Sequence, residues 1–142
     1  MFKVLIAVDG SEPSKRAIEA VARLAERSGP VNAVLIHVRE RISPHATLPS
    51  SLQAQLAQAN QQHQDTLIAE ALEHARGCGL TIGTTRRAQG AAAAEIVAAA
   101  AEVGADQIVI GTRGMGAIGN LFIGSTAQRV VHLADVPVLL VK

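Results

Sequence analysis

The segment Gly111-Thr-Arg-Gly-Met-Gly-Ala-Ile-Gly-Asn-Leu-Phe-Ile-Gly-Ser-Thr126 contains five glycines and ends in two hydroxyl residues. It follows the aliphatic run Gln107–Ile110 and precedes a segment of helical period. Glycine lets backbone N–H groups approach a ligand closely, and a helix N-terminus offers free N–H donors and a positive dipole end. A strand, a glycine-rich loop and a helix N-terminus in this order predict a site for phosphate.

The rest of the chain alternates between short apolar runs and longer segments of helical period. The short runs predict strands at Val4–Val8, Val31–Val38, Leu80–Thr85, Gln107–Ile110 and Val136–Val141. The first, fourth and fifth runs are nearly continuous in Val, Ile and Leu, which is typical of parallel strands covered on both faces. Strands that alternate with helices predict a single α/β domain over residues 1–142, with helices on both faces of a parallel sheet.

Four helices are expected between the strands. Ser11 can cap the first helix, Pro13 fits its first turn, and Gly29-Pro30 ends it. The third is expected over about 92–103, because alanine dominates there, and the fourth over about 125–134.

The second helix is expected over about 50–76. We expect its Gln-rich face, which includes Gln64, to be solvated. Its apolar stripe is expected to pack on the sheet and consists of Leu52, Leu56, Ala59, Leu67 and Ala71. Residues 39–49 are expected to form a surface loop.

The composition excludes several classes of protein. The chain has 142 residues and a net charge of +1, which gives no electrostatic basis for general binding to nucleic acid or to a membrane surface. It has two Phe and no Tyr or Trp, so the aromatic stacking of single-strand binders is not expected. No apolar run approaches the roughly 18 residues of a membrane span. We therefore expect a cytoplasmic protein with no nucleic-acid or membrane partner.

The metal-binding and nucleophilic residue types are sparse. Cys78 is the only cysteine, which excludes a disulfide within the chain. The histidines at 45, 63, 74 and 132 are scattered and show no metal-ligand spacing. His37 is interpreted as a structural histidine at a strand end, because no nucleophile is evident near it, and Arg86-Arg87 as a solvated strand end.

Two familiar phosphate-binding motifs fit the glycine-rich loop only in part. Gly114-Met-Gly-Ala-Ile-Gly119 matches GxGxxG, but it follows the fourth strand instead of the first, and a longer chain would be needed for a dinucleotide fold with a substrate domain. Gly119–Thr126 nearly matches the P-loop, but Ser125 stands where the lysine must be. Fast hydrolysis by a P-loop mechanism is therefore not expected.

A third pattern, Gly111-x2-Gly114-x9-Gly124-Ser125, fits in full. It resembles the nucleotide-binding signature G-2x-G-9x-G-[ST] of the universal stress protein family. The resemblance extends over the whole chain, because four further segments match family motifs in the family's order. These are Val8-Asp-Gly-Ser11 after the first strand, Leu35-Ile-His-Val38 in the second, Gly104-Ala-Asp-Gln-Ile-Val-Ile-Gly111 leading into the loop, and Val136-Pro-Val-Leu-Leu-Val141 in the last.

The resemblance implies a Rossmann-like fold, of the kind seen in adenine nucleotide alpha hydrolases, with a five-stranded sheet in the order 3-2-1-4-5. Strands 1 and 4 are then neighbours at the point where the winding reverses, which is where open α/β sheets bind ligands. Asp9 ends the first strand and Gly111 ends the fourth, so the phosphate site expected from the loop and the site expected from the fold coincide.

The resemblance also implies a set of residues that contact an adenine nucleotide, either ATP or AMP/ADP. Asp9 is expected to bind ribose hydroxyls or a Mg²⁺ ion, or else to serve only as a turn residue. Arg113 is either a phosphate partner or a solvated cation. The full expected set is Ala7, Val8, Asp9, Val38, Gly111, Thr112, Arg113, Gly114, Met115, Gly116, Ala117, Gly124, Ser125 and Thr126.

Three functions fit this sequence. The first is a nucleotide-dependent stress-response sensor or accessory protein that binds ATP or another adenine nucleotide. The second is a module of the same fold that acts through protein contacts alone, and the third is a slow ATPase. A homodimer through the last strand is also expected, because Val138-Leu-Leu-Val141 is an uncharged edge strand, and the family often pairs this way. The sequence identifies no other protein partner.

Overall fold

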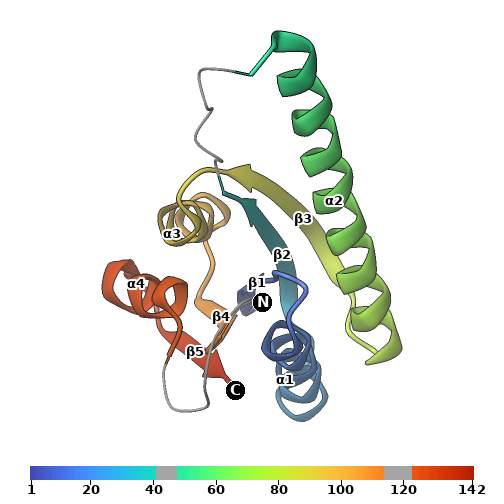
Figure 1. The fold of residues 1–142 in the computed structure, drawn as a ribbon. Helices are drawn as coiled ribbons and strands as arrows, with labels where there is room; N and C mark the ends of the chain where they lie inside the picture. Colours follow the sequence, from blue (N-terminus) through green and yellow to red (C-terminus); the bar gives the residue numbers. More distant parts are fainter. Residues whose placement is uncertain (41–47, 114–122) are drawn as a thin grey trace.

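A computed structural model describes residues 1–40, 48–113 and 123–142 of the chain (Figure 1). Strands and helices alternate along the chain, as the apolar pattern predicts. The elements are β1 (Lys3–Ala7), α1 (Glu12–Ser28), β2 (Asn32–Arg39), α2 (Ser50–Gly77), β3 (Ile82–Gln89), α3 (Ala92–Val103), β4 (Gln107–Gly111), α4 (Ser125–Leu133) and β5 (Val138–Val141). The segment 39–49, expected to be a surface loop, lies largely outside the described residues.

The five strands form one parallel sheet in the order β3-β2-β1-β4-β5, which confirms the expected topology. The central strand β1 pairs with β2 on one side, Ala7 opposite Ile36, and with β4 on the other, Ala7 opposite Ile110. The carboxyl ends of β1, β2 and β4 therefore meet at one edge of the sheet, where ligands of open α/β sheets bind.

Two helices cover each face of the sheet (Figure 1). Successive residues of a strand point to opposite faces, so Val4 and Ile6 pack in the core under α1 and α2, whereas Leu5 and Ala7 pack in the core under α3 and α4. Both faces are apolar, which explains the continuous aliphatic runs of the central strands.

The predicted helix ends of α1 are confirmed. The Ser11 hydroxyl accepts a hydrogen bond from the backbone N–H of Ser14 at 3.3 Å, as expected of an N-cap. Gly29 ends the helix with φ +95°, a conformation that favours glycine. These local signals act within a few residues, which is why the sequence alone locates them.

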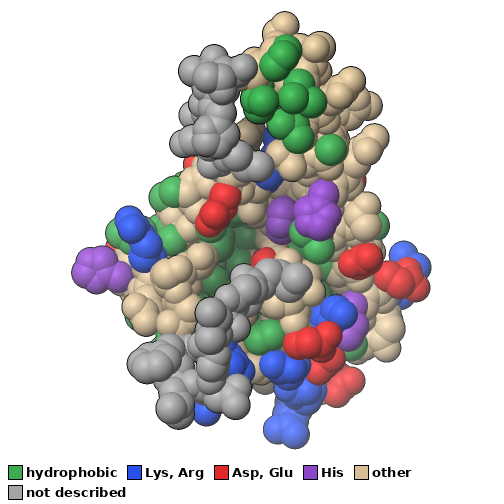
Figure 2. Space-filling view, viewed as in Figure 1, with side chains coloured by type: hydrophobic (Ala, Val, Ile, Leu, Met, Phe, Trp, Pro, Cys, Tyr) green, Lys and Arg blue, Asp and Glu red, His purple; other side chains and the backbone are tan. Residues whose placement is uncertain are grey.

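The expected packing of α2 is wrong for its first half. Leu52 and Leu56 are 39% and 45% exposed, and the first buried side chain of the helix is Gln64, which was expected in solvent. A helix of 28 residues is about 42 Å long, whereas a strand of 8 residues spans about 27 Å, so α2 overhangs the sheet. Figure 2 shows hydrophobic side chains exposed over this end of α2.

Gln64 is buried because it satisfies two backbone carbonyls. Its side-chain amide donates to the carbonyl of His37 in β2 at 3.1 Å and to that of Ala88 in β3 at 3.2 Å. A polar side chain is tolerated in an interior when it is hydrogen-bonded. The amide therefore ties α2 to two neighbouring strands.

Strand β3 extends further than expected, to Gln89. Arg86 and Arg87 are part of the strand, opposite Ile36 and His37, and do not form its end. An edge strand accepts charged side chains, and the two arginines pair on opposite faces, Arg86 with Glu102 at 3.3 Å and Arg87 with Asp65 at 2.8 Å.

Candidate functional site

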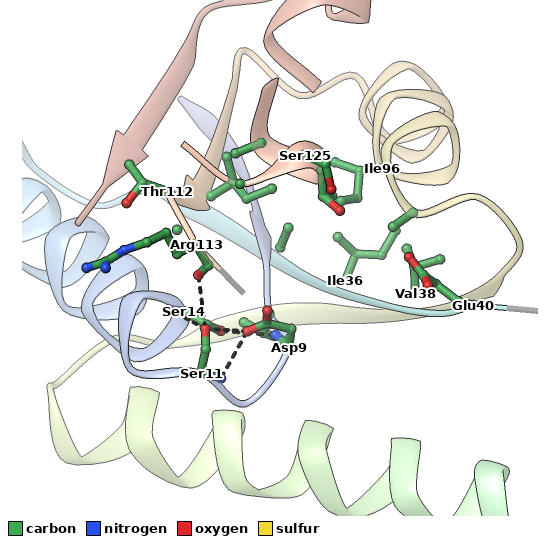
Figure 3. A pocket seen from close by; sticks show the side chains of 18 residues that line it. Asp9, Ser11, Ser14, Ile36, Val38, Glu40, Ile96, Thr112, Arg113 and Ser125 are labelled. Atoms are coloured by element: carbon green, nitrogen blue, oxygen red, sulfur yellow. Dashed lines mark hydrogen bonds between the residues drawn. The ribbon is translucent and has the colours of Figure 1, made fainter. Parts of the chain in front are cut away.

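A cavity of about 460 Å³ lies at the carboxyl ends of β1, β2 and β4 (Figure 3). The first residues of α3 and α4 close its other side. Its position is the point where the strand order reverses, beside the neighbouring strands β1 and β4. Figure 2 shows this face hollowed, with hydrophobic side chains at the bottom of the hollow.

The turn after β1 places Asp9 at the cavity. Gly10 adopts φ +83°, a conformation that favours glycine, and a Cβ atom there would lie 2.5 Å from Leu67 Cδ2, so that side chain would have to move. Asp9 Oδ1 accepts hydrogen bonds from the backbone N–H of Ser11 at 2.9 Å and from its hydroxyl at 2.5 Å. The backbone N–H of Asp9 donates to the Ser14 hydroxyl at 3.1 Å. These bonds hold the carboxylate against the first turn of α1.

One wall of the cavity is apolar. Ile36 and Val38 of β2 and Ile96 of α3 form it, and Figure 3 shows them on the same side of the cavity as Glu40. Ile36 and Ile96 are almost fully buried in the core below, so their packing against the sheet fixes this wall. The wall is suited to a flat apolar group.

The opposite wall is polar and belongs to β4 and α4. It contains residues 111–113 and 124–126. The backbone N–H of Thr112 donates to the carbonyl of Val141 at 2.7 Å, and the N–H of Gly124 donates to the carbonyl of Thr112 at 2.5 Å. No described side chain caps the start of helix α4 at Gly124, and the first N–H groups of a helix that lack such a partner can bind an anion.

Gly111 is required by packing. A Cβ atom at this position would lie 2.8 Å from Pro13 Cβ and 3.1 Å from the backbone nitrogen of Ser14. The glycine-rich pattern alone predicts only that this glycine lets a ligand approach closely. The structure shows that it also lets the end of β4 lie against the first turn of α1.

The structure brings the described members of the expected set together around this one cavity. They are Ala7, Val8, Asp9, Val38, Gly111, Thr112, Arg113, Gly124, Ser125 and Thr126. Gly114, Met115, Gly116 and Ala117 lie outside the described residues. In Figure 3 the guanidinium of Arg113 points away from Asp9 and Ser125, while its backbone carbonyl accepts a hydrogen bond from the Ser11 hydroxyl at 3.5 Å.

Sequence reasoning missed several residues of the lining. Glu40 directly follows β2, so the rule that ligands bind at strand ends was a signal for it. The others depend on which helix covers which strand, for which the sequence carries no motif. The full set is Ser11, Ser14, Ile36, Glu40, Ala92, Ile96, Ile110 and Ala127.

His37 lies near the end of β2. It is 8% exposed and is not part of the cavity lining. Burial lowers the pKa of its imidazole, and the negative charge of Asp9 opposes this only in part. The imidazole is therefore neutral at neutral pH.

None of the helices in the described ranges 1–40, 48–113 and 123–142 is long and apolar enough to cross a membrane.

The whole chain, residues 1–142, matches the model of the universal stress protein family. It is 35% identical over 146 residues to a universal stress protein of Thermus aquaticus, an alignment that covers both chains completely. A universal stress protein of Bacillus subtilis is 29% identical over 146 residues, with 99% of this chain and 98% of the relative covered.

Solved structures share the fold at lower sequence identity. The universal stress protein UspA of Lactobacillus plantarum matches with a TM-score of 0.83 and 20% identity, covering 99% of this chain and 97% of that one. A universal stress protein of Archaeoglobus fulgidus in complex with dAMP matches with a TM-score of 0.68 and 22% identity over 100% and 98% of the two chains. A family member from Arabidopsis thaliana with AMP bound matches with a TM-score of 0.69 and 21% identity over 100% and 92%.

Proposed function

The chain belongs to the universal stress protein family, and we propose that it binds an adenine nucleotide, ATP in particular, in the cavity at the ends of β1, β2 and β4. The observation that carries the proposal is the arrangement of this cavity. It has an apolar wall, the carboxylate of Asp9 after the end of β1, and the first N–H groups of α4, which no side chain of the described residues caps. Two structural neighbours with the same fold bind AMP and dAMP, which supports the proposal.

The base would lie against the apolar wall. Ile36, Val38 and Ile96 offer it a flat contact, and ligand pockets are commonly lined this way with a few polar groups that fix orientation. Ala7 and Val8 at the end of β1 border the same space. Val38 is the last residue of β2 that faces the cavity, and its backbone groups would form hydrogen bonds with the edge of the adenine ring.

The phosphates would lie against the start of α4. The N–H groups of this first turn and the hydroxyls of Ser125 and Thr126 are hydrogen-bond donors, and the helix dipole favours negative charge here. The glycines of the signature Gly111-x2-Gly114-x9-Gly124-Ser125 would allow the backbone to follow the phosphate chain.

Asp9 would bind the ribose or a Mg²⁺ ion. Both of its side-chain hydrogen bonds end on Oδ1, so Oδ2 is the oxygen on which a ribose hydroxyl or the ion would bind. Carboxylate oxygen is the ligand type that Mg²⁺ prefers. Ser11 would act as a positioning residue, because its two hydrogen bonds orient this carboxylate.

In this proposal the protein is a nucleotide-dependent sensor or accessory protein of the stress response and not a fast enzyme. The P-loop lysine that binds β- and γ-phosphates is replaced by Ser125. Calorimetric titration with ATP, AMP and GTP, followed by a hydrolysis assay on the ATP complex, tests the proposal. We expect one site per chain, a preference for adenine over guanine, and negligible turnover. Absence of binding by ATP and AMP would favour the module that acts through protein contacts, and steady turnover would favour the slow ATPase.

A matched pair of variants tests the location of the site. Ala92 and Ala94 both lie in the first turn of α3, but Ala92 borders the cavity one turn before Ile96, whereas Ala94 is exposed and outside the lining. Ala92→Phe should fill the apolar end and weaken binding by about tenfold or more, a change of about 1.4 kcal/mol. Ala94→Phe should leave the affinity unchanged. Equal affinities for the two variants would place the nucleotide elsewhere.

A further inference from the structure

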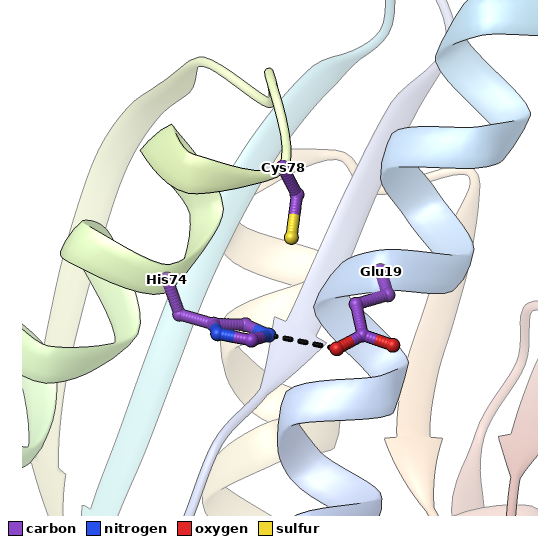
Figure 4. A group of neighbouring side chains, drawn as sticks. All are labelled: Glu19, His74 and Cys78. Carbon is purple, nitrogen blue, oxygen red and sulfur yellow. Dashed lines mark hydrogen bonds and ion pairs between the residues drawn. The ribbon is translucent and has the colours of Figure 1, made fainter.

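A second group of reactive side chains lies on the opposite side of the sheet, between α1 and α2 (Figure 4). A carboxylate oxygen of Glu19, a ring nitrogen of His74 and the Sγ atom of Cys78 lie within 4.8 Å of one another. In Figure 4 the thiol points down toward the pair formed by the imidazole and the carboxylate, whose Nε2 and Oε1 atoms are 3.0 Å apart. Among the residues that the structure describes, no other three side chains of these types come as close together.

The last turn of α2 holds two of these groups in fixed relation. His74 and Cys78 are four residues apart, so they project from the same face of the helix. The backbone N–H of Cys78 donates to the carbonyl of His74 at 3.1 Å, which joins the two positions through the helix ladder. Ala75, between them, is fully buried against the core, and this packing anchors the turn.

The third group comes from α1. Glu19 follows Ile18, which is 1% exposed, so the helix face that carries Ile18 is fixed on the sheet while Glu19 reaches across to α2. The side chains of Glu19 and His74 are 37% and 31% exposed to solvent. A shallow groove beside His74 and Cys78, bordered by Lys15, Glu70, Glu73 and Gly77, opens the cluster to solvent.

We propose that Glu19, His74 and Cys78 form a three-ligand site for Zn²⁺, with water from the groove as the fourth ligand. Zinc binds thiolate sulfur, imidazole nitrogen and carboxylate oxygen in a tetrahedron, and sites with three protein ligands keep one open position. Thiolate and carboxylate together neutralise the charge of the ion. On binding, the thiol proton leaves to solvent, and the proton that His74 Nε2 shares with Glu19 moves to Nδ1, so that the neutral imidazole can bind the ion.

The side chains need only a small adjustment to bind the ion. Ligand atoms of a tetrahedral zinc site lie about 3.3 to 3.8 Å apart. The three ligand atoms lie within 4.8 Å of one another, at most about 1 Å more than that spacing, and rotation of the side chains has to bring them closer. The hydrogen bond between His74 and Glu19 already places two of the three groups at ligand spacing.

Zinc titration of the untagged, nucleotide-free protein tests the proposal. A competing chelator dye should report one Zn²⁺ per chain with a Kd of about 1 μM or tighter. Co²⁺ in place of zinc should give a thiolate-to-cobalt charge-transfer band in the near ultraviolet. Cys78→Ser should abolish this band, and both Cys78→Ser and His74→Ala should weaken zinc binding by about tenfold or more.

Two control variants separate this site from other metal-binding residues. His132→Ala removes an exposed histidine of α4, and Asp9→Asn removes the carboxylate of the proposed nucleotide site; neither should change the zinc affinity. Circular dichroism checks that every variant is folded. Absence of zinc binding in the wild type, or equal zinc affinity of Cys78→Ser and the wild type, would overturn the proposal.

Discussion

Replacing Gly111 with alanine should disturb the packing of the end of β4 against the first turn of α1, which positions residues of the candidate site. The added Cβ atom would lie 2.8 Å from Pro13 Cβ and 3.0 Å from the Pro13 carbonyl carbon. Carbon atoms in good contact are about 3.5 to 4.0 Å apart, so the two elements must separate by about 0.7 Å or more. The obstructing atoms belong to a proline ring and to the helix backbone, and neither can rotate away.

The expected cost follows from this overlap. Overpacking of this kind lowers the free energy of unfolding by about 1 to 3 kcal/mol. For a domain of this size, that corresponds to a fall in Tm of about 4 to 12 °C. The same separation moves Ser14, whose hydroxyl accepts the backbone N–H of Asp9, so the affinity for ATP should also fall.

Thermal unfolding followed by circular dichroism measures the effect, with Gly77→Ala as the matched control. Gly77 is the last residue of α2, and a Cβ atom there meets nothing within 4 Å. Alanine is favoured over glycine in a helix by up to about 1 kcal/mol, so this variant should melt at or above the wild-type temperature. A Gly111→Ala protein that melts within about 1 °C of the wild type would refute the packing argument.

Three further predictions concern the metal ligand, the sheet edge and the buried histidine. EDTA should lower the ATP affinity of the wild type, and Asp9→Asn should lower it by the same amount without EDTA. If EDTA lowers the ATP affinity of both proteins equally, Asp9 is not a metal ligand. β5 is an edge strand and Leu139 is 38% exposed, so the protein should form a dimer through this strand. Light scattering at micromolar concentration should give twice 14.7 kDa for the wild type, and a mass closer to 14.7 kDa for Leu139→Pro. A wild-type mass of 14.7 kDa would end the dimer hypothesis. Burial lowers the pKa of His37 below 6.5, so the unfolded chain binds the proton first and stability should fall as the pH drops below 6.5. Denaturant titrations at neutral and acidic pH should show that His37→Gln loses less of its free energy of unfolding than the wild type does. An equal loss in both proteins would exclude His37 as the cause.

The fold was largely predictable because its signals are local. The Ser11 cap, the Gly29 stop and the continuous aliphatic strands each act within a few residues, and they set the order of elements. The packing of α2 was not predictable, because the sequence of a helix does not state where the strands beneath it end. Its Leu52 and Leu56 have helical spacing, yet they remain 39% and 45% exposed because α2 extends beyond the sheet.

The candidate site was predictable where it follows strand ends. Asp9 follows β1, Val38 is the penultimate residue of β2 and Gly111 ends β4, so topology alone brings them together. Ile96 required knowledge of which helix covers the sheet. The zinc cluster was missed for a related reason: the spacing of His74 and Cys78 was readable from the sequence, but Glu19 joins them only through the contact between α1 and α2.

The most direct test of the central proposal is to map amide chemical shifts on ¹⁵N-labelled protein during titration with ATP. We expect the largest changes at the ends of β1, β2 and β4 and at the start of α4, that is at Asp9, Val38, Gly111 and Thr126. The amide resonance of Cys78, on the far side of the sheet, should not shift. Unchanged cavity amides at saturating ATP, or shifts confined to a different surface, would contradict nucleotide binding in this cavity.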